Sequence, residues 1–270
     1  MARIPGRHFA KNLIERRSLL FQLVRRDFEQ RYVGSAAGWV WGVVHPLVLL
    51  VSWTFVFQVC LRVELPAGEA TSNYTLFLFA GMLPWLLFSE TVQRSANSLL
   101  EHANLITKTV FPAEVVPVSI FLSSLISHGM ALALAVAAIA IWENQISPLL
   151  ALLPAYALLL GLLAVGIGWI TASLQVYLRD TAQVLSVLLT FWFWLTPIFI
   201  TEDKIPPWLH FLVAGNPLAY VVRAYRLMLL GGSQGPSWGD FFTVAAFAVA
   251  TFVAGGLFFR HMKRGFADVL

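Results

Sequence analysis

Long apolar stretches alternate with short polar ones along most of the chain. Six of them reach about 20 residues, which is enough for a helix to cross a hydrocarbon core of about 30 Å. The pattern therefore predicts an all-α polytopic membrane protein. The six transmembrane helices are expected near residues 39–61, 75–94, 115–141, 149–176, 182–200 and 241–259.

A polar interlude separates the second and third apolar stretches. Within residues 99–112, Leu100, Ile106 and Val110 recur at helical spacing among polar side chains, so one face is apolar and the other is wet. Pro112 disfavours a helical conformation at the residue before it and ends this helix. The sequence predicts a short amphipathic helix that is joined to two spans. We call it the lever helix, because a force applied to it from outside the membrane would move both spans.

The chain begins with a basic segment, residues 1–36, ahead of the six-span domain at 37–270. Apolar residues recur three, four or seven apart over residues 9–33, with arginines on the opposite face. This spacing predicts an amphipathic helix at the membrane interface. The alternative is a solvated basic tail.

A further apolar segment, residues 203–232, lies between the fifth and sixth spans. Its stretches 206–214 and 217–230 are too short to cross a membrane, which predicts a re-entrant hairpin on the outer face. Arg223 and Arg226 lie on one face at headgroup height. They are expected either to anchor the helix by snorkelling or to contact a lipid phosphate.

Composition and charge agree with a membrane protein. The chain is 59% hydrophobic and 12% charged, against roughly 25% charged residues in soluble domains. Of its 18 Lys and Arg residues, 14 fall on the side that holds both termini and the lever, which predicts that this side is cytoplasmic. The position of the basic residues thus indicates that the charged surface binds membrane lipids and does not bind nucleic acid. A single cysteine, Cys60, excludes disulfides within the chain.

The fourth span carries small residues four apart, which predicts close helix packing within one subunit or between two. These residues are Ala157, Gly161, Ala164, Gly168 and Ala172.

Candidate chemistry within the spans is sparse. Glu90 and Arg94, four apart, can pair on one helix face, and we interpret them as mutual neutralisation in preference to a proton relay. Ser127 and His128 are adjacent on a helix and point about 100° apart, so they do not form a nucleophile–base dyad by themselves. The sequence holds no metal-binding motif and no phosphate-binding G-x-x-x-x-G-K-[ST] loop. If ATP drives this protein, another chain must hydrolyse it.

Aromatic residues concentrate in the second span and at the end of the fifth. They form either an aromatic belt at the membrane interface or a lining on which the apolar faces of sugar rings slide. The candidates for such a substrate path are Trp85, Phe88, Phe191, Trp192, Trp194 and Phe199.

Four patches together resemble the membrane subunit of ABC type-2 polysaccharide exporters, the O-antigen, capsule and teichoic-acid permeases. The first patch is Arg25-Arg26-Asp27-Phe28 with Arg31-Tyr32, Ser35, Gly38, Trp41 and Pro46. The second is Gly81, Pro84-Trp85 and Phe88, followed by Asn104-Leu105-Ile106, Lys108, Phe111-Pro112, Glu114 and Pro117. The others are Arg179-Asp180, and Asn216-Pro217 with Phe266-Ala267-Asp268.

The resemblance implies a homodimer of six-span subunits in the plasma (inner) membrane, paired with two ABC ATPase subunits that bind the ATP and Mg. The chain itself would carry no cofactor and no catalytic or metal site. A lipid-linked polysaccharide would pass outward between the two subunits. Residues that contact the ATPase would be Asn104, Leu105, Ile106, Lys108, Phe111, Pro112 and Glu114, and those of the interface helix Arg25, Asp27, Phe28, Arg31 and Tyr32.

Three rival functions remain open from the sequence. A secondary carrier needs ionisable groups near the midplane, and an intramembrane enzyme needs convergent acid and base groups; neither is evident. The third rival is an ABC type-2 exporter of a drug or small lipid. It differs from a polymer exporter in how strongly transport depends on the aromatic residues.

Overall fold

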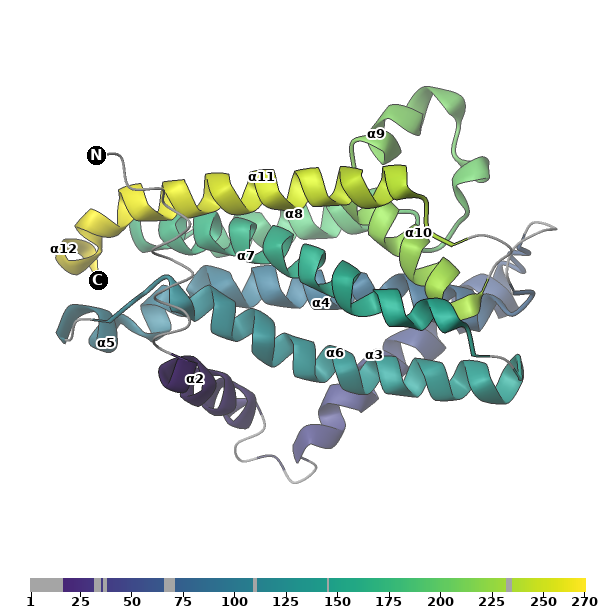
Figure 1. Ribbon diagram of the computed structural model, residues 1–270, viewed down its shortest axis with the longest axis horizontal. Coiled ribbons are helices and arrows are strands. Elements are labelled where there is room, and N and C mark those ends of the chain that lie inside the picture. Colours follow the sequence, from purple (N-terminus) through teal and green to yellow (C-terminus); the bar gives the residue numbers. More distant parts are fainter. Residues whose placement is uncertain are drawn as a thin grey trace.

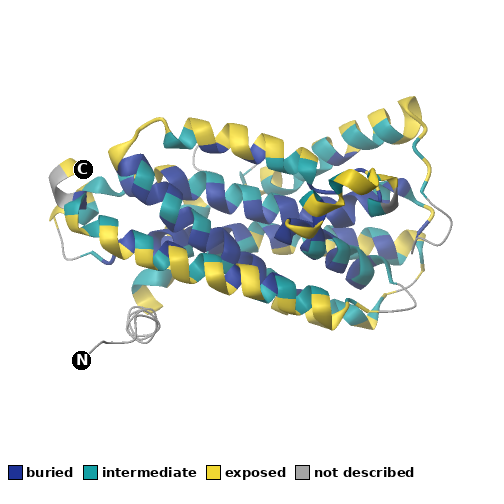
Figure 2. Ribbon diagram, turned by 90° about the horizontal axis from the view of Figure 1, so that it is seen from above, coloured by how far each residue is buried: buried dark blue, intermediate teal, exposed yellow. Residues whose placement is uncertain are grey.

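A computed structural model describes residues 17–31, 35, 38–65, 71–108, 111–144, 146–231 and 235–270. Across these ranges the regular structure is helical, without a strand, as the sequence predicts. Most helices run along the long axis of an elongated bundle (Figure 1). Dark, buried positions line its interior and exposed positions follow its outside (Figure 2).

Five of the six predicted spans are helices long and apolar enough to cross a membrane. Four are α4 (Tyr74–Glu101), α6 (Val115–Trp142), α7 (Leu153–Tyr177, preceded by the 3-10 turn η3, Pro148–Leu152) and α11 (Trp238–Met262). The fifth joins η1 (Gly38–Val40), α3 (Trp41–Thr54) and the π-helical turn η2 (Phe55–Cys60).

The remaining predicted span, residues 182–200, is shorter than the sequence suggests. Its helix, α8, covers Thr181–Leu195 and has 15 residues. Pro197 explains the early end, because a proline disfavours the helical conformation at the residue before it. Thr196 is indeed extended, with ψ at 129°.

Helix α4 forms the centre of the bundle and packs against α6, α7 and α10. Leu83, Phe88 and Val92 on this helix have no exposed surface. Asn73 caps its beginning, since its side chain accepts hydrogen bonds from the backbone N–H groups of Thr75 and Leu76. Helix α4, which carries Trp85, Glu90 and Arg94, is therefore packed on several sides by other helices.

The small face predicted on the fourth span is used inside the chain. Gly161 and Gly168 of this face leave room for the side chains of Phe121 on α6 and Ser95 on α4. Gly166, which was not part of the prediction and lies on the opposite face of α7, meets Gly255 of α11 backbone to backbone, and a Cβ at Gly255 would lie 2.2 Å from the Gly166 oxygen. This second contact joins α7 and α11 as a closely packed pair.

A helix is present over part of the predicted N-terminal segment: α2 (Arg17–Gln30) packs against α6, and its position at the membrane interface stays a prediction. Figure 1 shows α2 nearly end-on, so it crosses the direction of the long helices. Leu23 is buried, and Phe21 is 69% exposed. The rest of the predicted helix, residues 9–16 and 32–33, lies outside the described residues.

The predicted lever helix at 99–112 is wrong in its bounds. Helix α4 continues to Glu101, and a separate helix, α5, covers Ala103–Lys108. His102 separates the two helices, and its ring Nδ1 lies 2.8 Å from the carbonyl oxygen of Ser98 in the last turn of α4. At the same end of the bundle lie η6 (Lys263–Gly265) and α12 (Phe266–Val269) (Figure 1).

The two apolar stretches of the predicted outer hairpin are helical. The first comprises η5 (Pro207–Leu209) and α9 (His210–Ala214), which follow η4 (Glu202–Lys204) and project from the bundle (Figure 1). The second is α10 (Pro217–Leu230), which packs against α4, α7 and α11. Insertion of this hairpin into the outer leaflet stays a prediction.

Candidate functional site

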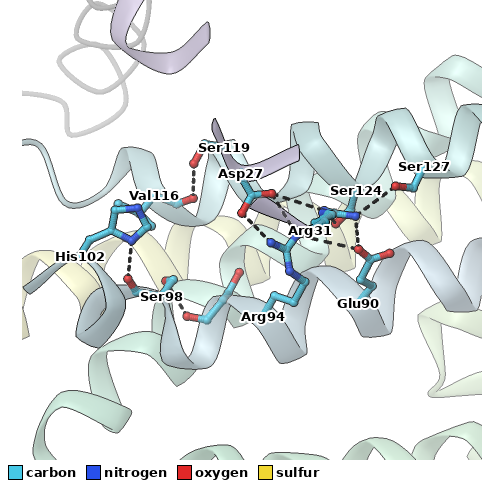
Figure 3. A network of polar contacts seen from close by, with 11 residues as sticks. Asp27, Arg31, Glu90, Arg94, Ser98, His102, Val116, Ser119, Ser124 and Ser127 are labelled. Atoms are coloured by element: carbon cyan, nitrogen blue, oxygen red, sulfur yellow. Dashed lines mark hydrogen bonds and ion pairs between the residues drawn. The ribbon is translucent and has the colours of Figure 1, made fainter. Parts of the chain in front are cut away.

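A network of four charged residues joins α2 to α4 (Figure 3). Arg94 on α4 donates two hydrogen bonds to Asp27 on α2, at 2.5 and 3.1 Å. Arg31, just after α2, pairs with Glu90 on α4 and lies 3.5 Å from Asp27. Each arginine therefore faces a carboxylate on the other segment, which fixes the position of α2 on the bundle.

Arg31 extends this network to α6. Its two terminal nitrogens donate to Ser124 and Ser127, each at 3.0 Å (Figure 3). The predicted pair of Glu90 and Arg94 exists at 3.9 Å, but both residues make closer contacts with the α2 segment. The interpretation as charge neutralisation remains a prediction, with Asp27 and Arg31 as partners that the sequence did not reveal.

Arg25 and Phe28, also predicted for the interface helix, lie on α2. Arg25 is exposed and pairs with Glu29 on the same helix, at 2.8 Å. The side-chain hydrogen bond and the charge of Glu29 raise the pKa of Arg25. Phe28 is half-buried, and Tyr32 lies outside the described residues.

A cavity of about 640 Å³ lies between α3, α4, α6 and α8. Four aromatic residues contribute to its walls: Trp41, Trp53, Trp85 and Phe193. Polar side chains line it as well: His45, Ser89, Glu90, Gln93, Ser124, Ser127, His128, Ser186 and Thr190.

A smaller cavity of about 260 Å³ lies under α2. Glu90 lines the larger cavity, whereas Asp27, Arg31 and Arg94 line the smaller one. The charged network therefore contributes side chains to both spaces.

Of the six aromatic residues predicted for a substrate path, Trp85 lines the large cavity. Phe88 and Phe199 are buried among other rings, and Trp192 donates a hydrogen bond to Asn216, at 2.9 Å. Phe191 and Trp194 are 65% and 61% exposed. For these five residues the structure gives the cavity role no support.

The structure instead places three other aromatic residues on the cavity wall: Trp41, Trp53 and Phe193. A signal for two of them was present, because Trp41, His45, Leu49 and Trp53 recur every four residues on one face of the first span, and all four line the cavity. Ser127 and His128 also line it, but they point to different partners. The ring of His128 lies 3.2 Å from the hydroxyl of Tyr225.

The two outer arginines are engaged within the chain. Arg223 donates to both carboxylate oxygens of Glu202, at 3.0 and 2.5 Å, and to Asp240 at 2.9 Å. Arg226 donates to the carbonyl oxygens of Pro197 and Ile198, at 2.9 and 2.5 Å. Contact of either arginine with a lipid headgroup stays a prediction that these bonds do not support.

Arg226 also stacks on an aromatic ring of α4. Its guanidinium carbon lies 3.6 Å from the ring centre of Phe77, a cation–π contact. A Cβ at Gly81, one turn further on, would lie 2.8 Å from a guanidinium nitrogen. Gly81 therefore allows Arg226 to dock α10 on α4.

The predicted ATPase-contacting residues cluster around α5. Asn104 and Lys108 are exposed, and Leu105 and Ile106 are half-buried. Past the segment 109–110, which lies outside the described residues, Pro112 is buried and Phe111 and Glu114 are half-buried. The exposed side of α5 thus forms part of the surface at one end of the bundle. That this end faces the cytoplasm stays a prediction.

These features define a multi-pass helical membrane protein with a polar and aromatic cavity inside its bundle. A family comparison makes the class specific, because the ABC-2 type transporter family matches residues 18–230. The chain belongs to this family.

Individual relatives match along nearly the whole chain. The O-antigen export system permease protein RfbA of Klebsiella pneumoniae is 28% identical over 257 residues, which cover 93% of this chain and 95% of the relative. The protein of the same name from Myxococcus xanthus is 27% identical over 260 residues, covering 96% and 97%. The polysialic acid transport protein KpsM of Escherichia coli is 24% identical over 245 residues, covering 88% and 91%.

Proposed function

We propose that this chain is the membrane subunit of an ATP-driven exporter that moves a lipid-linked, O-antigen-like polysaccharide out of the cytoplasm across the plasma (inner) membrane. Its family and the names of its relatives support export of a polysaccharide. The observation that carries the proposal is the composition of the large cavity.

The cavity combines two kinds of contact that suit a sugar polymer. Pyranose rings have apolar C–H faces, which the rings of Trp41, Trp53, Trp85 and Phe193 can cover. Their hydroxyl groups can bond to the serine and threonine side chains on the same walls. Aromatic surfaces do not demand one fixed hydrogen-bond pattern, so successive sugar units can occupy the same space as the polymer advances.

ATP hydrolysis is assigned to a partner subunit, which would bind the ATP and Mg, since this chain lacks a phosphate-binding loop. We expect that subunit to contact α5 through Asn104 and Lys108, whose side chains are exposed. Closure of two ATPase subunits would then displace α5 and, through Pro112 and Pro117, the helices on either side of it.

A second copy of this chain is the expected partner inside the membrane. The small face of α7 is already occupied, whereas α3, α8 and α11 expose apolar side chains. Of these three helices, α3 and α8 line the large cavity, so a second copy placed against them would enclose the substrate path. The exposed residues include Val48 and Val51 on α3, Phe55 directly after it, and Val184, Val187 and Phe191 on α8.

The aromatic walls supply the test. Trp53→Ala and Trp85→Ala would each remove one ring from the cavity, while Trp142→Ala, at the far end of α6 and 68% exposed, is the matched control. A ring contact contributes about 1 kcal/mol, so polymer export should fall roughly fivefold in each cavity variant. Export would be measured in membranes that contain the ATPase, with protein levels compared.

Unchanged export in both cavity variants, or an equal loss in Trp142→Ala, would contradict a sugar path along these walls. Export of a small lipid with little dependence on Trp53 and Trp85 would favour the alternative, an ABC type-2 exporter of a small molecule. Transport driven by an ion gradient without any ATPase would favour a secondary carrier.

A further inference from the structure

The cytoplasmic-side end of α11 is bound to the segment that leads from α5 into α6. Lys263, directly after α11, donates a hydrogen bond to Glu114, at 2.6 Å. Glu114 immediately precedes α6, and its backbone carbonyl also accepts a bond from the indole of Trp169 on α7, at 3.0 Å. One residue of the α5–α6 connection therefore contacts both α7 and the end of α11.

Helix α12 strengthens this connection. Its first residue, Phe266, is 1% exposed, and its ring packs near those of Tyr177 and Phe259, with centres 6.2 and 5.5 Å apart. The hydroxyl of Tyr177 donates to the carbonyl of Met262, at 2.9 Å. A Cβ at Gly265 would lie 2.5 Å from that hydroxyl, so the close approach requires glycine there.

Helix α12 also packs against α5 itself, and the two lie at the same end of the bundle (Figure 1). A displacement of α5 can therefore be transmitted to three long helices besides α4. It reaches α6 through the covalent chain, and α11 through Lys263 and α12. It reaches α7 through Glu114 and through the contact between Gly166 and Gly255. Closely packed elements with backbone contact move together instead of deforming.

We propose that Lys263 is a positioning residue for energy coupling: its ion pair with Glu114 transmits the movement of α5 to α11, and so to the α7–α11 pair. This inference rests on the proposed function, because it needs an ATPase acting on α5. It adds a second mechanical connection to the covalent one through α4 and α6.

The test uses charge reversal and charge exchange in the complete complex with its ATPase. Lys263→Glu and Glu114→Lys each break the pair, and the double variant restores it with the charges exchanged. Arg264→Glu is the matched control, because Arg264 is adjacent and exposed and has no ion pair within the described part of the chain. Lys263→Arg keeps the positive charge and should behave as the unmodified protein does.

The readout is the amount of polymer exported per ATP hydrolysed, with co-purification of the ATPase as the measure of assembly. Lys263→Glu should keep assembly and ATP hydrolysis but lower this ratio at least about fivefold, the lower end of typical coupling between sites. Glu114→Lys, at a residue also expected to contact the ATPase, should lower the same ratio in the complexes that assemble. The charge exchange and Lys263→Arg should restore it, and Arg264→Glu should leave it unchanged. Should the reversals weaken assembly, Lys263→Met, which removes the charge but keeps the length, is expected to lower the ratio in an assembled complex.

An unchanged ratio in both reversals and in Lys263→Met would overturn the role of Lys263. The same conclusion would follow if the exchanged pair failed to restore coupling, or if Arg264→Glu lowered it equally. In all of these cases the unmodified complex still exports polymer with ATP, so the proposed function would stand. Absence of ATP-dependent export by the unmodified complex would refute both.

Discussion

Neutralising Asp27 should release α2 from the bundle. Asp27→Asn preserves the shape of the side chain but removes the negative charge that faces Arg94 at 2.5 and 3.1 Å and Arg31 at 3.5 Å. Glu29→Gln makes the same chemical change two residues further on, where the ion-pair partner within the described part of the chain is Arg25 on the same helix, at 2.8 Å. The two variants thus compare a tertiary contact with a local one on the same helix.

The exposure of the side chains sets the expected magnitudes. Asp27 is 17% and Arg94 31% exposed, so their pair lies between a buried pair, whose disruption costs about 3–5 kcal/mol, and a surface pair, which contributes about 0–1 kcal/mol. We expect a loss of about 2 kcal/mol for Asp27→Asn, which corresponds to roughly 30-fold in an equilibrium. Arg25 and Glu29 are 71% and 58% exposed, so water screens their pair, and its loss should change the opening equilibrium by no more than about twofold.

Amide hydrogen exchange over Arg17–Gln30 measures this directly, because local opening of α2 exposes its backbone N–H groups. In lipid nanodiscs, exchange in this segment should accelerate roughly 30-fold for Asp27→Asn and about twofold for Glu29→Gln. Exchange in α7 should stay unchanged in both variants. Equal acceleration by the two variants, or less than about threefold for Asp27→Asn, would refute the view that the charged network holds α2 in place.

Two glycine substitutions, Gly255→Ala and Gly81→Ala, test how the bundle is packed, and Gly129→Ala is their control. The measurement for all three variants is thermal unfolding in detergent. Gly255→Ala places a methyl group against the backbone of Gly166 and should lower the free energy of unfolding by about 1–3 kcal/mol. Gly129→Ala, in a helix with open space around it, should raise this free energy by about 0.5–1 kcal/mol. Equal effects of the two variants would contradict the close α7–α11 contact. Gly81→Ala places a methyl group within 2.8 Å of the Arg226 guanidinium, which two backbone carbonyls hold in place. This variant should destabilise the folded protein by about 1–2 kcal/mol. An unchanged unfolding temperature would show that Arg226 moves freely.

Hydrophobic length predicted most of the fold, because a membrane span must be long and apolar whatever it packs against. It failed at α8, where Pro197 ends the helix early, and at α5, where α4 continues through residues assigned to the lever. Both errors concern boundaries within continuously apolar or amphipathic sequence, where periodicity alone does not show where one helix stops and the next begins.

The candidate site was predicted less completely. Trp85, predicted for a substrate path, lines the large cavity, whereas Trp41 and Trp53, which share one face of the first span, line the same cavity and are absent from the prediction. The partners of Glu90 and Arg94 lie about 60 residues earlier in the chain, at Arg31 and Asp27. Pairs so distant in sequence have no periodic signature, and only the folded arrangement of α2 across the bundle brings them together.

The central claim is that this chain moves a polysaccharide only when a partner hydrolyses ATP. The most direct measurement reconstitutes the chain with its ATPase in proteoliposomes and follows a lipid-linked polysaccharide across the bilayer. Translocation should require both chains and hydrolysable ATP, and should persist after ion gradients are dissipated. Translocation by this chain alone, driven by a proton or sodium gradient, would contradict the account.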